Sequence, residues 1–282
     1  MIRAQYRAQL RQAVAKLGYN VERIEAAKGR RVYKPLAGYS DAIYSRGRSE
    51  NLIIDVELNI VRDNIGFGFG PEGWHPFVAT LRGFIESSQQ QYSGSILEAY
   101  YRRFRPTDLF EVFFDRTTVK PPCVMQSAEP LTSLHLPWEL KPRTFDGANG
   151  LGQEHGWQLF GPVSLPKGEM EYDRTVNTYR SIIEKGFLWN RAPIKGTFLR
   201  IGDRYRFMIN SGNHRAAALA ARGDRTIPAA IDPRHLRVVD LADLHNWPAV
   251  ASGLITSEFA QALFLRYFDG NGRSKACALG LI

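Results

Sequence analysis

Two runs of alternating apolar and polar residues stand out in the second half of the chain. They are TFLRI and RYRFMIN, and the dipeptide Gly202-Asp203 separates them. Alternation with a period of two is typical of a strand with one buried face, and a two-residue turn that contains glycine favours a β-hairpin. The pattern therefore predicts a hairpin over residues 197–210.

Helical spacing flanks this hairpin on both sides. Upstream, Val176, Tyr179 and Ile182 share one face of a predicted helix that spans Glu169–Lys185. Downstream, an Ala-rich run predicts a second helix, which Gly223 can end. The segment TIPAAI then predicts a short strand.

The first half of the chain has shorter and more mixed patterns. Residues 117–152 are rich in Pro, Ser, Thr and Gly, which is typical of a connector. The other elements expected here are a helix over 1–17, a strand over 51–61, helices over 75–88 and 95–104, and a short strand over 109–114.

These elements predict an α+β protein with a boundary near FDGANGLG. We expect a mainly helical domain over 1–145, a mixed domain over 146–235 and a helical extension over 236–282.

Charge and cysteine content narrow the functional classes. The net charge of +9 and the pI of about 9.6 favour anionic partners such as nucleotides or nucleic acid. Cys123 and Cys277 lie far apart and lack metal-binding spacing, which indicates a reducing compartment. No apolar run is long enough to span a membrane, so we expect a cytoplasmic protein.

The start of the Ala-rich helix carries the strongest chemical signal. Gly212 precedes Asn213, His214 and Arg215 in its first turn. Unpaired N–H groups and the helix dipole favour an anion there, glycine permits a close approach, and arginine binds phosphate through two hydrogen bonds. The turn therefore predicts a phosphate site. The alternative is that Ser211 or Asn213 caps the helix, His214 packs and Arg215 makes a salt bridge.

The order of these segments resembles the ParB/sulfiredoxin superfamily. The similar pieces are YRSIIEKG (179–186), the hairpin, GNHRAAALAARG (212–223) and TIPAAI (226–231). The whole chain is also similar to ParB-like proteins of bacterial surface-polysaccharide regions. The resemblance implies a ParB/sulfiredoxin-like domain over 146–235 that binds a nucleoside triphosphate on its Gly-x-His-Arg turn.

The resemblance also implies roles for individual residues. His214 would stabilise phosphate charge, and Glu171 would be a base or a metal contact, with Glu169 and Asp173 as alternatives for the carboxylate. Helix N-terminal dipole pairing is the other explanation for all three acids. The implied cofactor-binding residues are Arg174, Ser211, Gly212, Asn213, His214 and Arg215.

Departures from the family pattern restrict the activity. Asn213 stands where sulfiredoxins have their reactive cysteine, which argues against reductase chemistry. Ser211 stands where free serine kinases have an aspartate, which puts metal binding and kinase activity in question. The chain after Ile231 is too short for the helix-turn-helix domain and dimerisation tail of partitioning proteins.

The expected cofactor is ATP or CTP with magnesium. The expected reaction is phosphoryl transfer to a small hydroxylated substrate, or nucleotide hydrolysis, with Arg215 holding the phosphates. One alternative is a non-catalytic module in which the nucleotide gates a partner interaction. Another is a nucleic-acid-binding protein that depends on the net positive charge.

Two further segments have patterns typical of ligand sites. Residues 68–73 match the dinucleotide pattern G-x-G-x-x-G, but no βαβ unit or following acidic residue accompanies them, so an ordinary turn is expected. Residues 155–164, HGWQLFGPVS, could cover a nucleotide base or pack on the core as an entry loop.

Overall fold

The structure is a computed structural model that describes residues 32–33, 39, 43, 52–114, 131, 133–144, 150–188, 193–232 and 234–282. Val32–Ile282 form one compact unit with an α+β fold. The helix predicted over 1–17, the cysteine Cys123 and much of the predicted connector lie outside the described residues.

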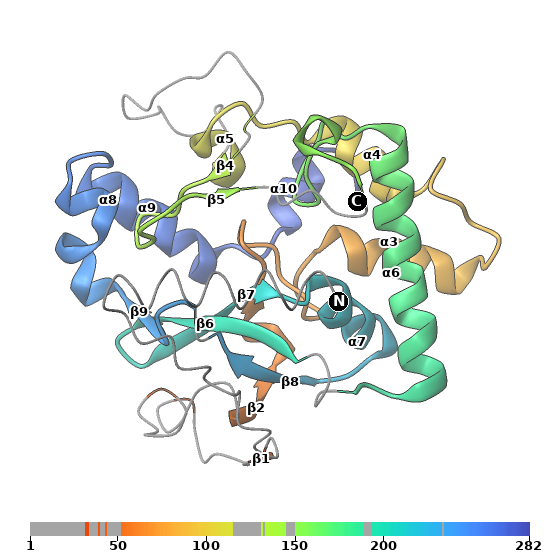
Figure 1. Ribbon diagram of the computed structural model, residues 1–282, viewed down its shortest axis with the longest axis horizontal. Coiled ribbons are helices and arrows are strands. Elements are labelled where there is room, and N and C mark those ends of the chain that lie inside the picture. The colour runs from red at the N-terminus through yellow and green to blue at the C-terminus, as the bar shows by residue number, and fades with distance from the viewer. Residues whose placement is uncertain are drawn as a thin grey trace, which may run out of the picture. The chain divides into compact units, whose positions relative to one another are not determined.

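A mixed sheet runs through this unit in the order β1-β2-β8-β6-β7-β3, and β9 also pairs with β6 (Figure 1). The predicted hairpin is confirmed as the antiparallel pair β6–β7. Strands β4 and β5 form a separate antiparallel ladder. The strands are β1 (Val32–Tyr33), β2 (Leu52–Glu57), β3 (Val61–Arg62), β4 (Ser133–Leu134), β5 (Arg143–Thr144), β6 (Ile194–Ile201), β7 (Arg204–Ser211), β8 (Thr226–Ile231) and β9 (Val238–Asp240).

The register brings the ends of β7 and β8 to the same edge of the sheet. Lys195 of β6 lies opposite Ser211 of β7 on one side and opposite Ala230 of β8 on the other. Because neighbouring strands lie about 4.8 Å apart, roughly 10 Å separates Ser211 from Ala230. The chain segments that follow β7 and β8 therefore begin close together.

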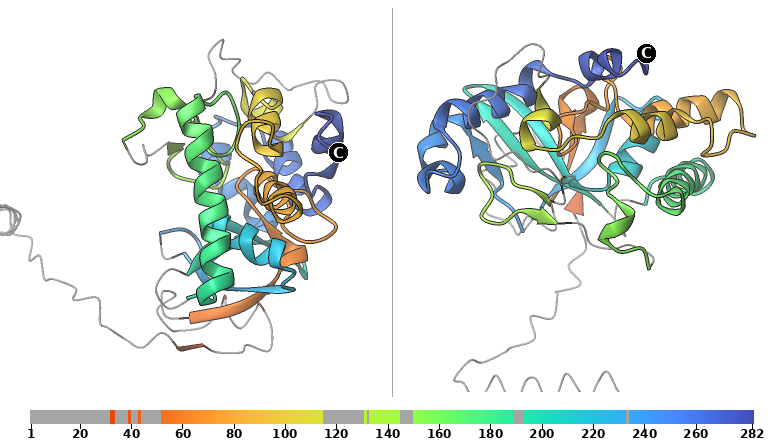
Figure 2. Two further views of the ribbon diagram at one scale, coloured as in Figure 1. Left: turned by 90° about the vertical axis from the view of Figure 1, so that its right-hand side faces the viewer. Right: turned by 90° about the horizontal axis from the view of Figure 1, so that it is seen from above.

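Helices α3, α6 and α7 pack against one another, and α4 contacts α3 and α6. Figure 2 shows α6 as a long helix beside α3 and α7. The helices, with the 3-10 helices η2 to η4, are η2 (Leu58–Ile60), α3 (Pro76–Glu86), α4 (Ile96–Arg103), α5 (Leu109–Phe113), η3 (Gln153–His155), α6 (Leu165–Lys185), α7 (Asn213–Arg222), η4 (Leu241–Asn246), α8 (Pro248–Ala251), α9 (Ser257–Asp269) and α10 (Arg273–Ala278). No described helix is long and apolar enough to cross a membrane.

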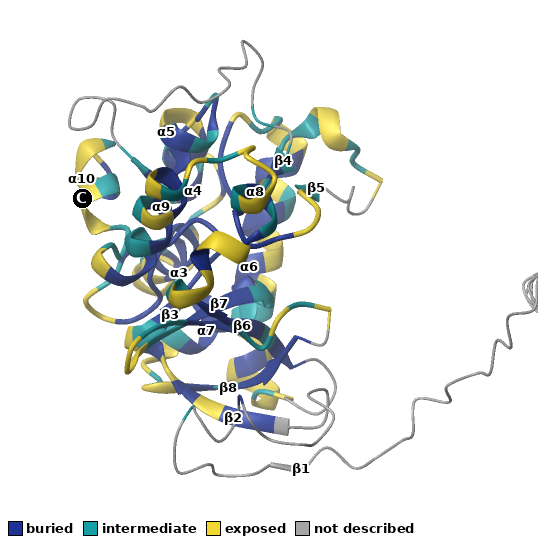
Figure 3. Cartoon of the chain, turned by 90° about the vertical axis from the view of Figure 1, so that its left-hand side faces the viewer, coloured by how far each residue is buried: buried dark blue, intermediate teal, exposed yellow. Residues whose placement is uncertain are grey.

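Buried residues are concentrated in the sheet and on the helix faces that meet it (Figure 3). Phe198 and Phe207 of the hairpin are fully buried, as are Ala216, Ala217 and Ala218 of α7. The small alanine side chains let α7 approach α3 and α6 closely, and this packing fixes the start of α7 against the sheet.

The strand predicted over 109–114 is wrong, because the segment forms helix α5. Asp108 accepts a hydrogen bond from the backbone N–H of Glu111, and the Glu111 carboxylate accepts one from the backbone N–H of Thr107. These reciprocal bonds satisfy N–H groups at the start of the helix, so they favour a helical turn over an extended run.

Two predicted helix starts also differ from the structure. Helix α6 begins at Leu165 rather than Glu169, because Ser164 caps it and a proline lies in its first turn. The acids Glu169, Glu171 and Asp173 therefore lie beyond the first turn, where the helix dipole has little effect. The N-cap residue of α7 is Gly212, not Ser211 or Asn213.

The sheet combines strands from all three predicted segments. Strands β2 and β3 from the first half pair with β8 and β7, and β9 from the predicted helical extension pairs with β6. The expected boundaries after residues 145 and 235 therefore fall inside one compact unit. Helices do make up most of the rest of the tail, as expected.

Candidate functional site

A cleft of about 1730 Å³ opens beside the edge where β7 and β8 end. Residues of α6, the first turn of α7, the β4–β5 hairpin and η4 line it. Sites for single small molecules are typically about 300–1000 Å³, so this cleft has room for more than one ligand. The predicted residues that line it are Glu171, Arg174, Ser211, Gly212, Asn213, His214 and Arg215.

The first turn of α7 has backbone donors without partners inside the helix. The first intrahelical bond runs from Ala216 N–H to the Gly212 carbonyl, so the N–H groups of Asn213 and His214 have no such partner. Gly212 has no side chain that could cap them. These N–H groups are therefore available to an anion in the cleft.

Glycine is required at position 212 for two reasons. Its φ of 109° lies in the left-handed region that other residues avoid. A Cβ atom at Gly212 would also lie 3.0 Å from Nη2 of Arg215 and 3.2 Å from the Cα of Ile194. The backbone is thus exposed to the cleft at a point where any side chain would crowd it.

Two arginines give this end of the cleft its positive charge. Arg215 is half-buried in the first turn of α7, and Arg174 is exposed on α6. Burial lowers the pKa of the Arg215 guanidinium, and the nearby charge of Arg174 lowers it further. An anion bound between the two side chains would offset this repulsion.

Glu171 forms a buried charge pair beneath the turn. Its carboxylate lies 2.8 Å from Nζ of Lys167 and 2.9 Å from Nε2 of His214, and the residue is fully buried. Burial raises the pKa of this carboxyl, but the hydrogen bonds and charges of His214 and Lys167 outweigh burial and lower it to about 2. Such a carboxylate is a weak proton acceptor, so the geometry favours an orienting role over that of a base or metal ligand.

His214 is held rigidly beside the turn. Its ring stacks on Phe77 of α3 at a centroid distance of 4.5 Å, and its Nε2 bonds to Glu171. Burial lowers its pKa, and the hydrogen bond and charge of Glu171 oppose that shift. His214 therefore packs, as one alternative expected, and also lines the cleft.

Asn213 contributes an unused acceptor at the same turn. The residue is 5% exposed, and its Oδ1 has no hydrogen-bond partner among the described residues. A buried amide oxygen without a partner costs free energy, and a ligand donor or cation could satisfy it.

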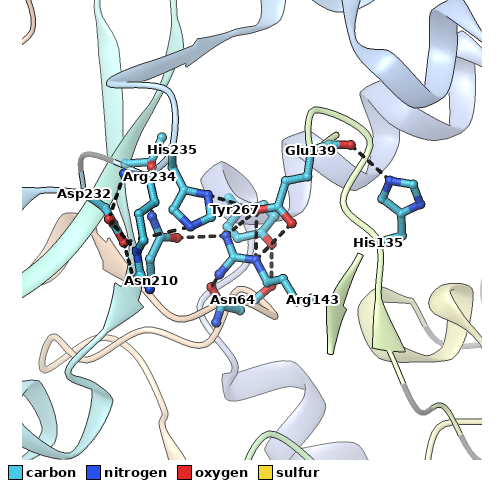
Figure 4. Close-up of polar contacts among 10 residues, drawn as sticks. Asn64, His135, Glu139, Arg143, Asn210, Asp232, Arg234, His235 and Tyr267 are labelled. Carbon is cyan, nitrogen blue, oxygen red and sulfur yellow. Dashed lines mark hydrogen bonds and ion pairs between the residues drawn. The ribbon is translucent and has the colours of Figure 1, made fainter. Parts of the chain in front are cut away.

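A second polar cluster, which the sequence did not predict, lies in the same cleft (Figure 4). At its centre, Nε of Arg143 lies 2.8 Å and 3.0 Å from the two oxygens of Glu139. The same guanidinium donates to Oδ1 of Asn210 at 2.9 Å and to Oδ1 of Asn64. Arg143 thus ties the β4–β5 hairpin to the end of β7.

His235 stands between two carboxylates of this cluster. Its Nδ1 lies 3.8 Å from Oε1 of Glu139, and its Nε2 lies 3.9 Å from Oδ2 of Asp232. Asp232 is fully buried and pairs with the exposed Arg234. Burial and the charge of Arg143 lower the pKa of His235, while the two carboxylates oppose this shift.

Two short sequence signals could have pointed to this cluster. The segment LPWELKPR places tryptophan and mixed charges between prolines, and loops with such residues often carry function. The segment IDPRH places Asp232 and His235 directly after a predicted strand, where ligands often bind in α/β folds. Neither signal could show that the two segments meet.

The glycines of residues 68–73 have a packing role, which agrees with the expected turn. A Cβ atom at Gly73 would lie 2.6 Å from the Gly68 carbonyl oxygen, and one at Gly70 would lie 2.8 Å from the Cα of Asn59. The backbone N–H groups of Gly68 and Trp74 both donate to the Asn271 carbonyl. The loop therefore needs glycines at 70 and 73 in order to pack on itself and on Asn59, and its backbone is bonded to the tail at Asn271.

Part of the segment 155–164 lines the cleft, and part of it packs on the core. Trp157 and Gln158 line the cleft, whereas Leu159 and Phe160 are buried. The hydroxyl of Tyr101 donates to the Gln158 carbonyl at 2.9 Å, which anchors the segment on α4.

No group of three or more His, Cys, Asp or Glu is placed to hold a metal ion in the part of the chain that the structure describes. Comparisons of the chain with protein-family models, with curated proteins and with solved structures found no match.

Proposed function

We propose that the cleft binds a nucleoside triphosphate, ATP or CTP with magnesium, with its phosphates at the start of α7. The observation that carries this proposal is the pair of open backbone donors at Asn213 and His214, which line the same cleft as Arg174 and Arg215. The resemblance of this segment to the ParB/sulfiredoxin superfamily supports the same assignment.

The residues present fit the phosphates well. Gly212 allows the phosphate oxygens to approach the backbone, and Arg215 would bind them through two hydrogen bonds. Magnesium would depend mainly on phosphate oxygens and water, because Glu171 is engaged by Lys167 and His214. When bound, the ion would neutralise phosphate charge. Magnesium prefers oxygen ligands, and the amide oxygen Oδ1 of Asn213 is one oxygen at this turn that could contact it.

Phosphoryl transfer to a small hydroxylated substrate, or nucleotide hydrolysis, is the reaction that we propose for this site. The pairing of His214 with Glu171 and Phe77 fixes the turn that holds the phosphates. Phosphoryl transfer depends mainly on positioning and charge stabilisation, which a fixed turn and two arginines can supply.

A non-catalytic module is the second candidate. It is favoured by the burial of Glu171 in its charge pairs, because the Glu171 carboxylate is then not free to act as a base at this turn. In that case the nucleotide would gate a partner interaction. Tight binding without nucleotide turnover would distinguish this module from the enzyme.

Thermal unfolding with ATP, ADP, CTP and GTP, with and without magnesium, tests the proposal. A ligand at 100 times its dissociation constant adds about 2.7 kcal/mol of stability, which raises Tm by a few degrees. Arg215→Ala should abolish the shift, whereas Arg222→Ala should keep it, because Arg222 pairs with Asp224 at the other end of α7. No shift with any nucleotide, or an equal loss in both variants, would contradict the proposal.

A further inference from the structure

We propose that the Glu139–Arg143–His235 cluster is an acceptor subsite for an uncharged, hydroxyl-bearing small molecule, and that His235 accepts the proton of its reacting hydroxyl. This inference rests on the proposed nucleotide site and names the second substrate class for the same cleft. The cleft has room for both molecules, since its 1730 Å³ exceeds the volume of a typical single-ligand site of about 1000 Å³ or less.

The fold places the two ends of the cleft within reach of each other. The pairing of Lys195 with both Ser211 and Ala230 puts the end of β8 roughly 10 Å from the phosphate turn. Asp232 and His235 follow β8 directly, and the backbone N–H of Asp232 donates to the Gly196 carbonyl at 2.8 Å. Bound phosphates and a small acceptor could bridge this separation.

Asn210 links the two ends rigidly. It lies two positions before Gly212, and its Oδ1 accepts from Arg143 while its Nδ2 donates to Oγ1 of Thr197 at 3.0 Å. Its amide is therefore fixed by partners on two sides. The position of Arg143, and that of Glu139 bonded to it, is thus set relative to the start of α7.

His235 is placed to exchange a proton, in contrast to His214. The two carboxylates lie 3.8 and 3.9 Å from its ring nitrogens, beyond ordinary hydrogen-bond distance, so they do not occupy those nitrogens. Its side chain is 29% exposed and lines the cleft. Once the ring is protonated, Glu139 and Asp232 would stabilise the imidazolium, while Arg143 and Arg234 limit that stabilisation.

The local charges favour an uncharged substrate. The guanidinium groups near this end are paired: Arg143 with Glu139, Arg234 with Asp232, and Arg200 with Asp240. Because each of these three guanidinium groups already has a carboxylate partner, they offer little attraction to an anionic substrate. Hydroxyl groups can instead bond to the neutral ring of His235 and to the polar edges of the cleft.

The proposed step is balanced in atoms and electrons. The hydroxyl oxygen of the acceptor forms a bond to the γ-phosphorus, and the bond from that phosphorus to the bridging β–γ oxygen breaks. The nucleoside diphosphate leaves with the electron pair, and the hydroxyl proton passes to a ring nitrogen of His235 and then to solvent. Water takes the place of the acceptor when no other hydroxyl is bound.

Single-turnover release of phosphate from γ-labelled ATP and CTP tests this role, together with calorimetric titration of each nucleotide. His235→Gln should slow release about 100-fold or more, since general bases contribute roughly 10²–10⁴-fold. It should leave the dissociation constant of the nucleotide within about twofold and should remove the fall in rate at acid pH. His245→Gln is the matched control, because His245 is exposed and does not line the cleft.

Glycerol serves as the probe for the acceptor, and glycerate serves as its charged counterpart. We expect labelled glycerol phosphate to form at the expense of inorganic phosphate, with less transfer to glycerate. Hydrolysis without any transfer to glycerol would overturn the acceptor assignment.

The remaining outcomes separate this inference from the proposed function. If His235→Gln releases phosphate at the wild-type rate, and the rate still falls at acid pH, the role of His235 is overturned. Nucleotide binding without any phosphate release would overturn the inference and leave the binding site standing. Absence of nucleotide binding would overturn both.

Discussion

The two ends of the cleft use charge in opposite ways. At the start of α7, backbone donors lack intrahelical partners, and Arg174 and Arg215 repel each other, so this end becomes more stable when an anion arrives. At the other end, Arg143 is bonded to Glu139, Asn64 and Asn210 before any ligand is present. The first end is therefore suited to binding a charged ligand, and the second to holding side chains in fixed positions.

The two histidines repeat this contrast. His214 lines the cleft but is 7% exposed, and its Nε2 is bonded to Glu171, so its ring mainly supports the turn. His235 is more exposed and lies beyond hydrogen-bond distance of its carboxylate neighbours. Only His235 therefore combines access to the cleft with ring nitrogens that those carboxylates leave unoccupied.

Removal of Glu139 should have the largest effect on stability. Glu139→Ala leaves the half-buried Arg143 guanidinium, whose side chain is 13% exposed, without its carboxylate, and breaking a pair that is largely buried typically costs about 3–5 kcal/mol. Urea unfolding measures this loss. Glu154→Ala is the control, because Glu154 is 74% exposed beside His155 and should change stability by about 1 kcal/mol or less. Equal losses of stability in the two variants would mean that the Glu139–Arg143 pair does not hold this end of the cleft in a fixed position.

Acid should weaken the contacts of Glu171 beneath the first turn of α7. The pKa of Glu171 is lowered to about 2 in the folded state from 4.5 in the unfolded chain, so its contribution is fully present above pH 4.5. That contribution, on the order of 3 kcal/mol, is lost as the pH falls from about 4.5 towards 2. Glu171→Gln should be less stable at neutral pH and should lose less stability across this window. Urea unfolding at each pH measures this loss. If the free energy of unfolding falls equally with pH in both proteins, the loss does not come from Glu171.

Gly212→Ala should have a smaller effect on stability but a specific effect on binding. The left-handed conformation costs a residue with a Cβ atom about 1–2 kcal/mol, and contact with Arg215 and Ile194 adds to this. Gly202→Ala, at φ 54° in the hairpin turn, meets no atom within 4 Å and should pay only the conformational cost. We expect the affinity for ATP or CTP, measured by calorimetry, to fall at least tenfold in Gly212→Ala alone. Equal affinities in both variants would show that ligands do not approach this backbone.

Local signals predict much of the structure around the start of α7. The hairpin, the glycine before α7 and the Ala-rich face lie in one continuous segment, so periodicity and turn chemistry were sufficient. The sequence does not point to Lys167, because the cap at Ser164 starts helix α6 before its predicted start at Glu169. The apolar run over 109–114 predicts a strand, but the capping of the segment by Asp108 favours helix α5.

The other end could not be predicted, because its geometry depends on long-range pairing. Glu139 and His235 meet only because the β4–β5 hairpin and the end of β8 face the same cleft. Likewise, the parallel contact of β6 with β8 sets the separation of Ala230 from Ser211. No local pattern in a single sequence specifies such a register.

The central claim is that nucleotide phosphates bind at the first turn of α7, and backbone amide NMR with a non-hydrolysable ATP or CTP analogue tests it most directly. We predict that the largest saturable chemical-shift changes will fall on Gly212, Asn213, His214 and Arg215, with little change at the hairpin turn around Gly202. The largest changes at residues 68–73, or none at the α7 turn under saturating analogue, would contradict the account.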